Sequence, residues 1–486
     1  MAEARVGVIE TGLGDYPPAP FSPPIRYPEY PFEDISPAGN PVYDAVRRLL
    51  ASLGMDESNF GAPGWNPLRG LIRPGMRVLV KPNLVRHYHP YGLDPRAIVT
   101  HGSVVRAICD YIVVALGGRG EMVIADAPLQ SCDFGAVLAL AGIDAVASYY
   151  RARGVTAEIR DLRLVRAVAE HRGFYGKVLV QVLNGGDPLG YTTIDLGRAS
   201  LHSSRRVDDS RYRVTCYDPD RMRKHHGEGR HEYVIANTLL QSDVVINLPK
   251  MKTHHKAGLT GALKNFIGIN GHKDCLPHHV KGSAVQGGDE YRFPDWRKRL
   301  DSWILDLKET SSPVLVKKTA AVAHRVLHAV HMRGGGSYWE GSWHGNDTIS
   351  RTTLDLNRIV RYAARDGGMQ QTAQREVLSL VDGVIAGDMD GPLAPRPRQA
   401  KVLVAGENAV AVDMVLARMM GFRFEAIPAI VHALEGLVGV WRLADFRPSE
   451  LRVISPSARW NGLLVEGGGE SLGFEPHQGW RGHIEL

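Results

Sequence analysis

Cysteine is scarce in this 486-residue chain, and its spacing excludes several kinds of site. The four cysteines, Cys109, Cys132, Cys216 and Cys275, never stand in a C-x-x-C pattern. That pattern is typical of ferredoxin-type iron–sulfur clusters and of zinc ribbons, so we expect no iron–sulfur cluster. Cysteines this far apart also fit a reducing compartment better than a disulfide scaffold.

Long apolar runs and an excess of one charge are missing too. No segment reaches the length of a transmembrane helix and no signal peptide is recognisable, so we expect a cytoplasmic protein with no membrane partner. The formal net charge of +6 is modest for this length, and no long Lys/Arg run occurs. We therefore expect a small anionic ligand rather than nucleic acid, and the sequence leaves oligomerisation open.

Strand and helix patterns alternate along the chain, which predicts an α/β fold. We expect two lobes with mainly parallel sheets covered by helices. The expected segments are an extended Pro-rich arm over residues 1–40, a main α/β domain over 41–294, a helical insertion with a Trp-rich loop over 295–375, and a C-terminal α/β lobe over 376–486.

Short apolar runs mark the strands, at residues 76–80, 122–125, 155–163, 177–182, 244–248, 377–381, 401–405 and 452–455. Helical periodicity marks residues 40–53, 94–116, 134–150, two segments within 295–330, a segment starting near 352, and 409–420. Three strands end in a charged residue within two positions of a proline: Lys81, Asp126 and Lys250. Proline fixes the exit direction of the chain, so we expect these side chains at the carboxyl edge of the sheet.

The stretch from Ser242 to His279 is the most informative part of the sequence, because a buried strand leads into a segment rich in lysine and histidine. Ligand crevices in open α/β sheets lie just beyond the carboxyl ends of strands, where this segment begins. A histidine beside several cations stays neutral near pH 7 and can act as a base, and a buried lysine can do the same. The expected catalytic residues are Lys250, Lys252, His254 and His255, with Asp126 as a carboxylate partner.

Glycines in the same stretch favour an anion site. A helix beginning near Thr260 would offer free N–H groups beside Lys264, with both residues on one helix face. The alternative is tight helix–strand packing at Gly258 and Gly261. The residues expected to hold an anionic substrate or cofactor are Lys81, Asn83, Thr260, Gly261, Lys264 and Asn265.

A divalent metal is a further expectation, although the identity of any cofactor is left unknown. Imidazole nitrogens and a distant carboxylate would suit zinc, nickel or iron(II). The candidate ligands are His278, His279, Asp388 and Asp390. For the two aspartates the alternative is an ordinary Asp/Gly turn. His324 and His328 have i, i+4 spacing, but without a carboxylate near them in the sequence a solvated helix face is favoured. Asp413, within an amphipathic helix, is given a structural role.

Two other segments are distinctive. Residues 339–347 combine aromatic and polar side chains, including Trp339 and Trp343, which either pack together or form a wall or lid of the pocket. Residues 183–235 are polar and Arg-rich, and include His225, His226 and His231. Their basic residues are assigned to a solvated surface, and the alternative is that they help a substrate anion to enter.

Six short motifs occur in order: VKPNL at 80–84, DAP at 126–128, INLPKMKTH at 246–254, GLTGALKN at 258–265, DG at 382–383 and AVD at 411–413. Together they resemble the domain of unknown function 362 family over roughly residues 76–425. Many members carry a ferredoxin-like iron–sulfur segment, which this chain lacks. The resemblance implies an α/β fold and leaves the activity largely unassigned.

A strand followed by His254, a glycine-containing segment ending in Lys264, and later histidines is similar, more distantly, to the nickel-dependent lactate racemase family. This resemblance implies that His254 is catalytic, that Lys264 carries a pincer nucleotide, and that His278 or His279 ligates nickel.

These residues predict an enzyme that acts on a small carboxylate- or phosphate-bearing substrate by acid–base chemistry, such as isomerisation or epimerisation. Its pocket would be formed by Lys81, Asp126, Asp382 and the segments 250–279 and 339–347. The alternative is a protein that binds or matures a metal or an anionic cofactor without turnover of its own.

Overall fold

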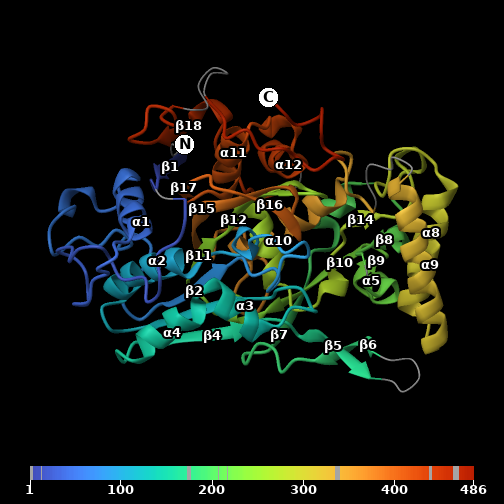
Figure 1. The fold of residues 1–486 in the computed structure, drawn as a ribbon, viewed down its shortest axis with the longest axis horizontal. Coiled ribbons are helices and arrows are strands. Elements are labelled where there is room, and N and C mark those ends of the chain that lie inside the picture. The colour runs from blue at the N-terminus through green and yellow to red at the C-terminus, as the bar shows by residue number, and fades with distance from the viewer. Residues whose placement is uncertain are drawn as a thin grey trace.

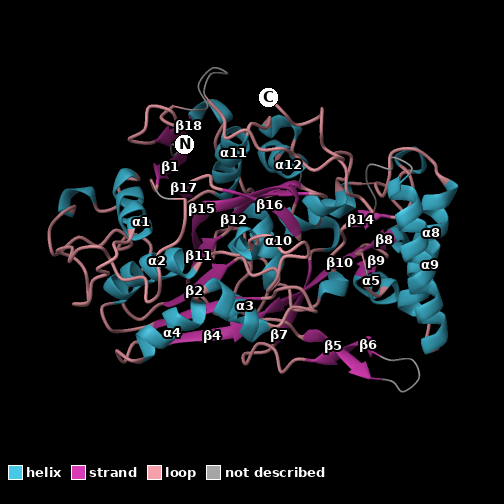
Figure 2. Cartoon of the chain, in the orientation of Figure 1, coloured by secondary structure: helices cyan, strands magenta, loops and turns pink. Residues whose placement is uncertain are grey.

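The computed structural model describes residues 4–486, apart from residues 13, 172–176, 206, 216, 334–339, 437–439 and 463–469. An 11-stranded sheet runs through the molecule with helices on both faces (Figure 1 and Figure 2). Its main path is β18 (Leu451–Ile454), β1 (Ala4–Glu10), β17 (Val402–Gly406), β15 (Glu376–Asp390), β11 (Val244–Leu248), β2 (Arg77–Pro82), β3 (Glu121–Asp126) and β4 (Ala157–Asp161).

The centre of this sheet is parallel. Strands β15, β11, β2, β3 and β4 pair in parallel, so that Ile246 lies between Leu378 and Val80. Parallel strands covered on both faces need continuous apolar sequence, and β11 is buried along its whole length. The predicted α/β class, with a mostly parallel sheet flanked by helices, is confirmed. Strands from the expected main domain and C-terminal lobe belong to one sheet.

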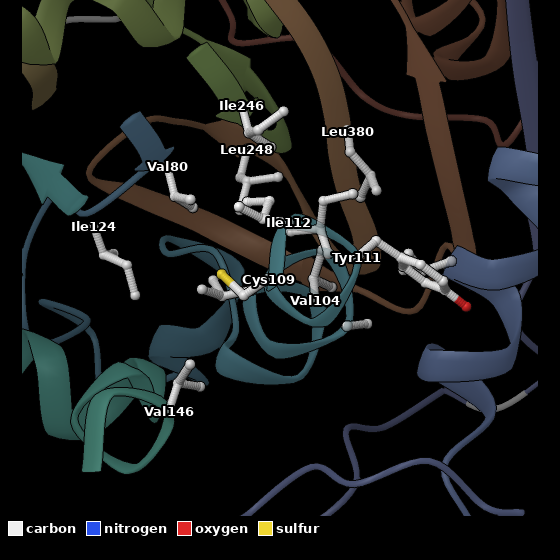
Figure 3. Close-up of a cluster of buried hydrophobic side chains, with 14 of the residues drawn as sticks. Val80, Val104, Cys109, Tyr111, Ile112, Ile124, Val146, Ile246, Leu248 and Leu380 are labelled. Carbon is white, nitrogen blue, oxygen red and sulfur yellow. The ribbon is translucent and has the colours of Figure 1, made fainter. Parts of the chain in front are cut away.

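Successive residues of each strand face opposite sides, which divides the core into clusters. Val80 packs with Ile246, Leu380 and helix α2 (Gly102–Leu116), as Figure 3 shows. The same face is covered by α1 (Pro41–Ser52), α3 (Phe134–Ala141) and α4 (Ile143–Arg151). On the opposite face lie α6 (Asn237–Leu240) and α10 (Thr348–Tyr362), and a further cluster surrounds α11 (Ala409–Met420) and α12 (Pro428–Glu435).

Shorter elements complete the fold. Three strands extend the main sheet: β12 (Lys250–His254), β13 (Gly258–Thr260) and β16 (Ala394–Arg398). The smaller sheets contain β7 (Tyr191–Asp195), β10 (Arg230–Ala236) and β9 (His226–Gly227); β14 (His279–Val280) and β8 (Tyr212–Arg213); and β5 (Val165–His171) and β6 (Lys177–Leu183). The remaining helices are α5 (Pro219–His225), α7 (Ala262–Asn265), α8 (Trp296–Thr310) and α9 (Val314–Arg333). The last two match the helices expected within 295–330.

Two predicted helices have different limits. The helix expected from residue 94 begins at Gly102, where the His101 side chain caps it. The helix expected over 134–150 is divided into α3 and α4 at Gly142, whose φ of +72° interrupts the helical backbone. Within the described residues, none of the helices combines the length and apolar character needed to cross a lipid bilayer.

The N-terminal segment differs from the expected extended arm. Residues 4–10 form β1, which pairs antiparallel with β17 and parallel with β18. Val6 and Val8 are fully buried in it. The Pro-rich stretch over 14–39 contains neither helix nor strand, and its Phe21 and Tyr30 pack into the core beside α1 and α2. The short alternating run at the start was obscured by the proline-rich composition that follows it.

An interior position for β1 predicts that charge is not tolerated there. We expect Val8→Asp, which buries a carboxylate among apolar side chains, to lower the free energy of unfolding by at least about 3 kcal/mol. Arg5→Ala, at an exposed position of the same strand, should change it by no more than about 0.5 kcal/mol. Urea denaturation followed by circular dichroism measures both, and equal stabilities would exclude β1 from the core.

Candidate functional site

Two buried ion pairs hold the carboxyl ends of the parallel strands together. Lys81 of β2 donates to Asp126 at the end of β3, with Nζ and Oδ1 2.7 Å apart. Lys250, at the start of β12, donates to Asp382 of β15 at 3.0 Å. All four side chains are at most 3% exposed. Because a buried charge is costly without a partner, each aspartate fixes its lysine in place. The charged strand ends predicted from the sequence do lie at this edge.

Tyr16, in the N-terminal segment, forms hydrogen bonds with both members of the second pair. Its hydroxyl donates to Asp382 at 2.7 Å and accepts from Lys250 Nζ at 2.6 Å. Its ring stacks on the imidazole of His101, with centroids 3.9 Å apart. The backbone N–H of His101 donates to the other Asp382 oxygen at 2.9 Å. Sequence reasoning missed both aromatic residues, because no local pattern links them to a strand end 234 residues away.

An amide network joins the first pair to the lysine–histidine segment. Asn265 Oδ1 accepts from Asn83 at 3.1 Å and from Lys81 at 3.4 Å. Its Nδ2 donates to Asn247 at 2.8 Å. Asn83 Oδ1 accepts from Lys252 Nζ at 2.7 Å. The predicted residues Lys81, Asn83, Lys252 and Asn265, from three separate segments, therefore lie in one connected network.

Lys264 is surrounded by other cations. Burial lowers its pKa to about 7, and the charges of Lys273 and Lys256 act in the same direction. Lys252 lies close enough that the charge of Lys264 contributes to a strongly lowered pKa there as well. Each protonated lysine disfavours protonation of the others. An anion placed among them would favour the protonated forms again. The cluster therefore favours the binding of an anion.

Three imidazoles lie beside Lys264. Burial lowers the pKa of His254, His255 and His278 well below the usual 6.5, and the charge of Lys264 is a further cause in each case. The rings of His254 and His255 are edge to face, with centroids 5.2 Å apart. At neutral pH these side chains are uncharged, which is the state in which an imidazole accepts a proton or binds a metal.

Hydrogen bonds determine which ring nitrogen carries the proton. His254 Nδ1 accepts from the backbone N–H groups of Lys256 and Ala257, at 3.0 and 3.2 Å, so the neutral ring is protonated at Nε2. His278 Nδ1 lies 2.6 Å from the carbonyl oxygen of Leu276, which can only accept, so its lone pair is on Nε2. His254 is therefore arranged as a donor and His278 as an acceptor.

Exposure differs within the cluster. Lys252 and His254 are 0% and 4% exposed, whereas His255, Lys264 and His278 are partly exposed. A ligand from solution would meet these three side chains first. A cavity of 290 Å³ elsewhere, at the start of β15, is bordered by residues such as Glu376 and includes none of the lysines or histidines of the cluster.

The helix N-terminus expected near Thr260 is not an anion site. Gly258–Thr260 form β13, and α7 is a single turn over Ala262–Asn265. Two N–H groups of that turn already donate to the carboxylate of Asp413, at 2.6 and 3.1 Å. A Cβ at Gly261 would lie 2.0 Å from Asp413, so the glycine serves packing, as the alternative interpretation held. The Asp413 contacts also agree with a structural role.

The predicted metal ligands do not form one group. The carboxylate of Asp388 is buried and accepts from Arg396 and Arg398 at 2.8 and 3.2 Å. Asp390 is 53% exposed at its side chain. Among the described residues, the group with the spacing of a metal site is a different one: Asp301, His324 and Glu340.

Two expectations about other histidines are wrong. His324 does have a carboxylate beside it, because Asp301 of the preceding helix lies 2.7 Å from its Nδ1. His226 and His231 do not lie on a solvated surface but are 0% and 2% exposed, and His226 Nε2 is 2.9 Å from the carbonyl oxygen of Cys275. Their charged neighbours in the sequence concealed a buried strand pair.

The segment over 339–347 contributes both packing and positioning. Trp343 is buried and donates from Nε1 to the Asp289 carbonyl oxygen at 2.8 Å, as expected for aromatic packing. Asn346 is fully buried and donates to the carbonyl oxygen of His278 at 2.9 Å, so this segment supports the site. Trp339 lies outside the described residues.

Residues 78–181 and 203–418 match the model of a family described as Domain of unknown function (DUF362). The chain belongs to this family. It is also 22% identical over 384 residues to a thylakoid-associated protein, sll1697, of Synechocystis sp., a match that covers 79% of this chain and 73% of that protein.

A crystal structure of a Thermotoga maritima protein from a structural genomics programme is 10% identical, with a TM-score of 0.31. The match covers 76% of this chain and 56% of the other, so the chain spans little more than half of that protein. A TM-score this low does not establish a shared fold.

The Lys81–Asp126 pair allows a direct test of what fixes the site. We expect Asp126→Asn, which leaves a buried lysine charge without its counter-ion, to lower the free energy of unfolding by about 3–5 kcal/mol. The double variant Lys81→Met/Asp126→Leu should recover much of that loss. Asp220→Asn, in an exposed pair with Arg223, should cost no more than about 1 kcal/mol.

Chemical denaturation of the four proteins under one set of conditions provides the comparison. If the double variant is as unstable as Asp126→Asn, the unpaired charge is not the source of the loss.

Proposed function

We propose that the protein is an enzyme that acts on a small carboxylate- or phosphate-bearing substrate by acid–base chemistry. The observation that carries the proposal is the position of Lys264, whose pKa is near 7, among the neutral imidazoles of His254, His255 and His278. Perturbed pKa values grouped in this way are typical of catalytic sites.

An anionic substrate is supported by the way in which the site's carboxylates are already paired. Asp126 and Asp382 are committed to Lys81 and Lys250, and the ammonium of Lys252 donates to the neutral side-chain oxygen of Asn83. The positive charge nearer Lys264 is therefore not balanced by those two acids. An anion from solution would supply the counter-charge and would gain from the low dielectric of the buried site.

The two ring tautomers give the proton-transfer roles. His278, with its lone pair on Nε2, is the proposed base that removes a proton next to the substrate carboxylate. The Nε2–H of His254 and the ammonium of Lys264 then stabilise the negative charge that develops on the carboxylate oxygens. Return of the proton to the same or a neighbouring carbon completes an epimerisation or isomerisation. His255 borders the same cluster as a second proton carrier.

The proposal draws on the resemblance of this segment to nickel-dependent lactate racemases, which implies roles for His254, Lys264 and one of His278 or His279. The nickel of that family is not part of the proposal. Asp388 is held by two arginines and Asp390 is exposed, so the expected oxygen ligands do not fit a nickel site with the histidines. We assign no step to a metal.

A second candidate function follows from the burial of Lys252 and His254. A ligand that reaches these residues would leave slowly, which suits a protein that holds or matures an anionic cofactor without turning it over. Native mass spectrometry of the purified protein separates the two candidates, because retention of a stoichiometric anion without turnover favours the second.

The pKa of Lys264 predicts a pH dependence of anion binding. As pH rises through about 7, Lys264 loses its charge, so sulfate affinity should fall between pH 6 and 8, by up to about tenfold per unit above the pKa. Sulfate is the probe because its own charge is constant over this range. Isothermal titration calorimetry should show that Lys264→Met binds weakly and loses most of the pH dependence.

Lys224→Met, at an exposed position of α5, is the matched control and should bind sulfate like the unmodified protein. A sulfate affinity that is independent of pH, or a Lys264→Met variant with an unchanged pH profile, would contradict the proposed role of this lysine.

The proposed base predicts exchange of substrate hydrogen with solvent. In D₂O, the protein should exchange the α-hydrogen of at least one small 2-hydroxy or 2-amino acid, measured by proton NMR. His278→Gln should lower this rate by about 100-fold or more while sulfate affinity stays within about threefold. His483→Gln, at an exposed position outside the cluster, should retain the full rate. Full exchange in His278→Gln would remove it as the base.

A further inference from the structure

The hairpin of α8 and α9 has a surface unlike the rest of the molecule. It lies at one end of the structure, shown in yellow in Figure 1. Trp296 and Trp303 are 68% and 56% exposed. Other large exposed hydrophobic side chains in and next to the hairpin are Phe293, Leu300, Leu315, Val322, Val326 and Val330. Isolated exposed hydrophobic residues are ordinary, but a group of this kind marks a contact surface.

The exposed residues follow helical spacing. In α8 they are three and four positions apart, at Trp296, Leu300 and Trp303, and in α9 Val322, Val326 and Val330 are each four apart. Each helix therefore presents an apolar stripe to solvent. Ile304 and Ala320 are buried, so the helices have a second apolar side that packs inside the protein.

The same helices carry most of the net charge of the chain. Their sequences contain eight basic and three acidic residues, a formal charge of +5, compared with +6 for the whole protein. All three acids are paired: Asp301 with His324, Glu309 with Lys308, and Asp306 with Arg213 and Lys281 outside the hairpin. The hairpin therefore combines exposed aromatic side chains with an unbalanced positive charge.

We propose that the α8–α9 hairpin docks on the surface of an anionic lipid membrane. Tryptophan, whose ring is largely apolar and whose N–H is polar, suits the boundary between headgroups and acyl chains, and lysine and arginine are attracted to anionic headgroups. Docking of this kind needs no membrane-spanning helix. It replaces the expectation, drawn from the lack of a long apolar run, that the protein has no membrane partner.

Charge complementarity favours a membrane over a second copy of the chain. A symmetric dimer through this face would bring two surfaces of charge +5 together, and like charges in contact oppose association. An anionic bilayer satisfies both the apolar stripes and the positive charge.

Docking would also fix the orientation of the candidate site. Asp306 of α8 accepts from Arg213 of β8 at 2.9 Å and from Lys281 at 2.6 Å. Lys281 directly follows β14, which begins at His279, next to His278. The hairpin is therefore attached to the strand that directly follows His278 of the lysine–histidine cluster, and the two would be held together at the membrane.

The test uses the full-length protein and sedimented vesicles. Vesicles containing phosphatidylglycerol should bind the protein, vesicles of phosphatidylcholine alone should not, and added salt should weaken the binding. The double variants Trp296→Ser/Trp303→Ser and Arg299→Glu/Arg325→Glu, the latter at exposed positions of the two helices, should each lower the affinity by about tenfold or more. Tyr91→Ser, 71% exposed elsewhere, and Arg119→Glu, also exposed, are the matched controls and should bind normally.

Tryptophan fluorescence gives a second readout, because Trp296 and Trp303 should shift to shorter wavelength on binding and the shift should vanish in Trp296→Ser/Trp303→Ser. Sulfate affinity should be unchanged in every variant, which separates this proposal from the catalytic one and confirms folding. Equal binding to both vesicle types, or binding that survives the tryptophan substitutions, would overturn the proposal. So would a dimer in sedimentation velocity that the tryptophan substitutions abolish, with no vesicle binding.

Discussion

Two buried lysine–aspartate pairs determine the rest of the site. Lys81 with Asp126 and Lys250 with Asp382 join strands that come from four separate parts of the chain, at the carboxyl edge of the parallel sheet. Each of these charges would be costly to bury alone, so each is tolerated in the interior only beside its partner. Asp126 and Asp382 are thereby occupied, and among the described residues neither acid forms an ion pair with Lys252 or Lys264.

The electrostatics of the cluster follow from that constraint. Lys252 and Lys264 lie near one another and near three imidazoles, and burial together with mutual repulsion lowers every pKa in the group. A protein gains nothing in stability from repulsion of this kind. Such an arrangement becomes favourable when an anion enters, and it keeps imidazoles neutral and ready for proton transfer at physiological pH. The electrostatic repulsion within the cluster is thus linked to its proposed chemistry.

The sequence predicted those features of the site that a local pattern of residues determines. An apolar run that stops at a proline predicted the ends of β2 and β11, and the geometry of a parallel sheet predicted that Lys81 and Lys250 would lie at one edge. The amide and lysine residues around Asn265 were found for the same reason, since the segment that carries them leaves that edge. These predictions needed only periodicity and the direction of the strands.

The contacts that the sequence did not predict are made with partners elsewhere in the chain. Nothing beside Tyr16 marks it as the partner of Lys250, and nothing beside Ala262 shows that Asp413 will occupy the N–H groups expected for an anion. Asp388 was a candidate metal ligand, but Arg396 of the neighbouring strand β16 donates to its carboxylate. The exposure of Trp296 and Trp303 was equally hidden, because helical periodicity predicts a helix but not which of its faces the rest of the protein covers.

The central claim is that lysine and histidine side chains from separate segments form one anion pocket, and crystallography with a heavy oxyanion tests it most directly. Crystals grown with tungstate should give an anomalous peak within hydrogen-bonding distance of Lys264 Nζ and of the Nε2–H of His254. Peaks confined to other surfaces, with the cluster empty at a tungstate concentration that saturates binding in solution, would contradict the account.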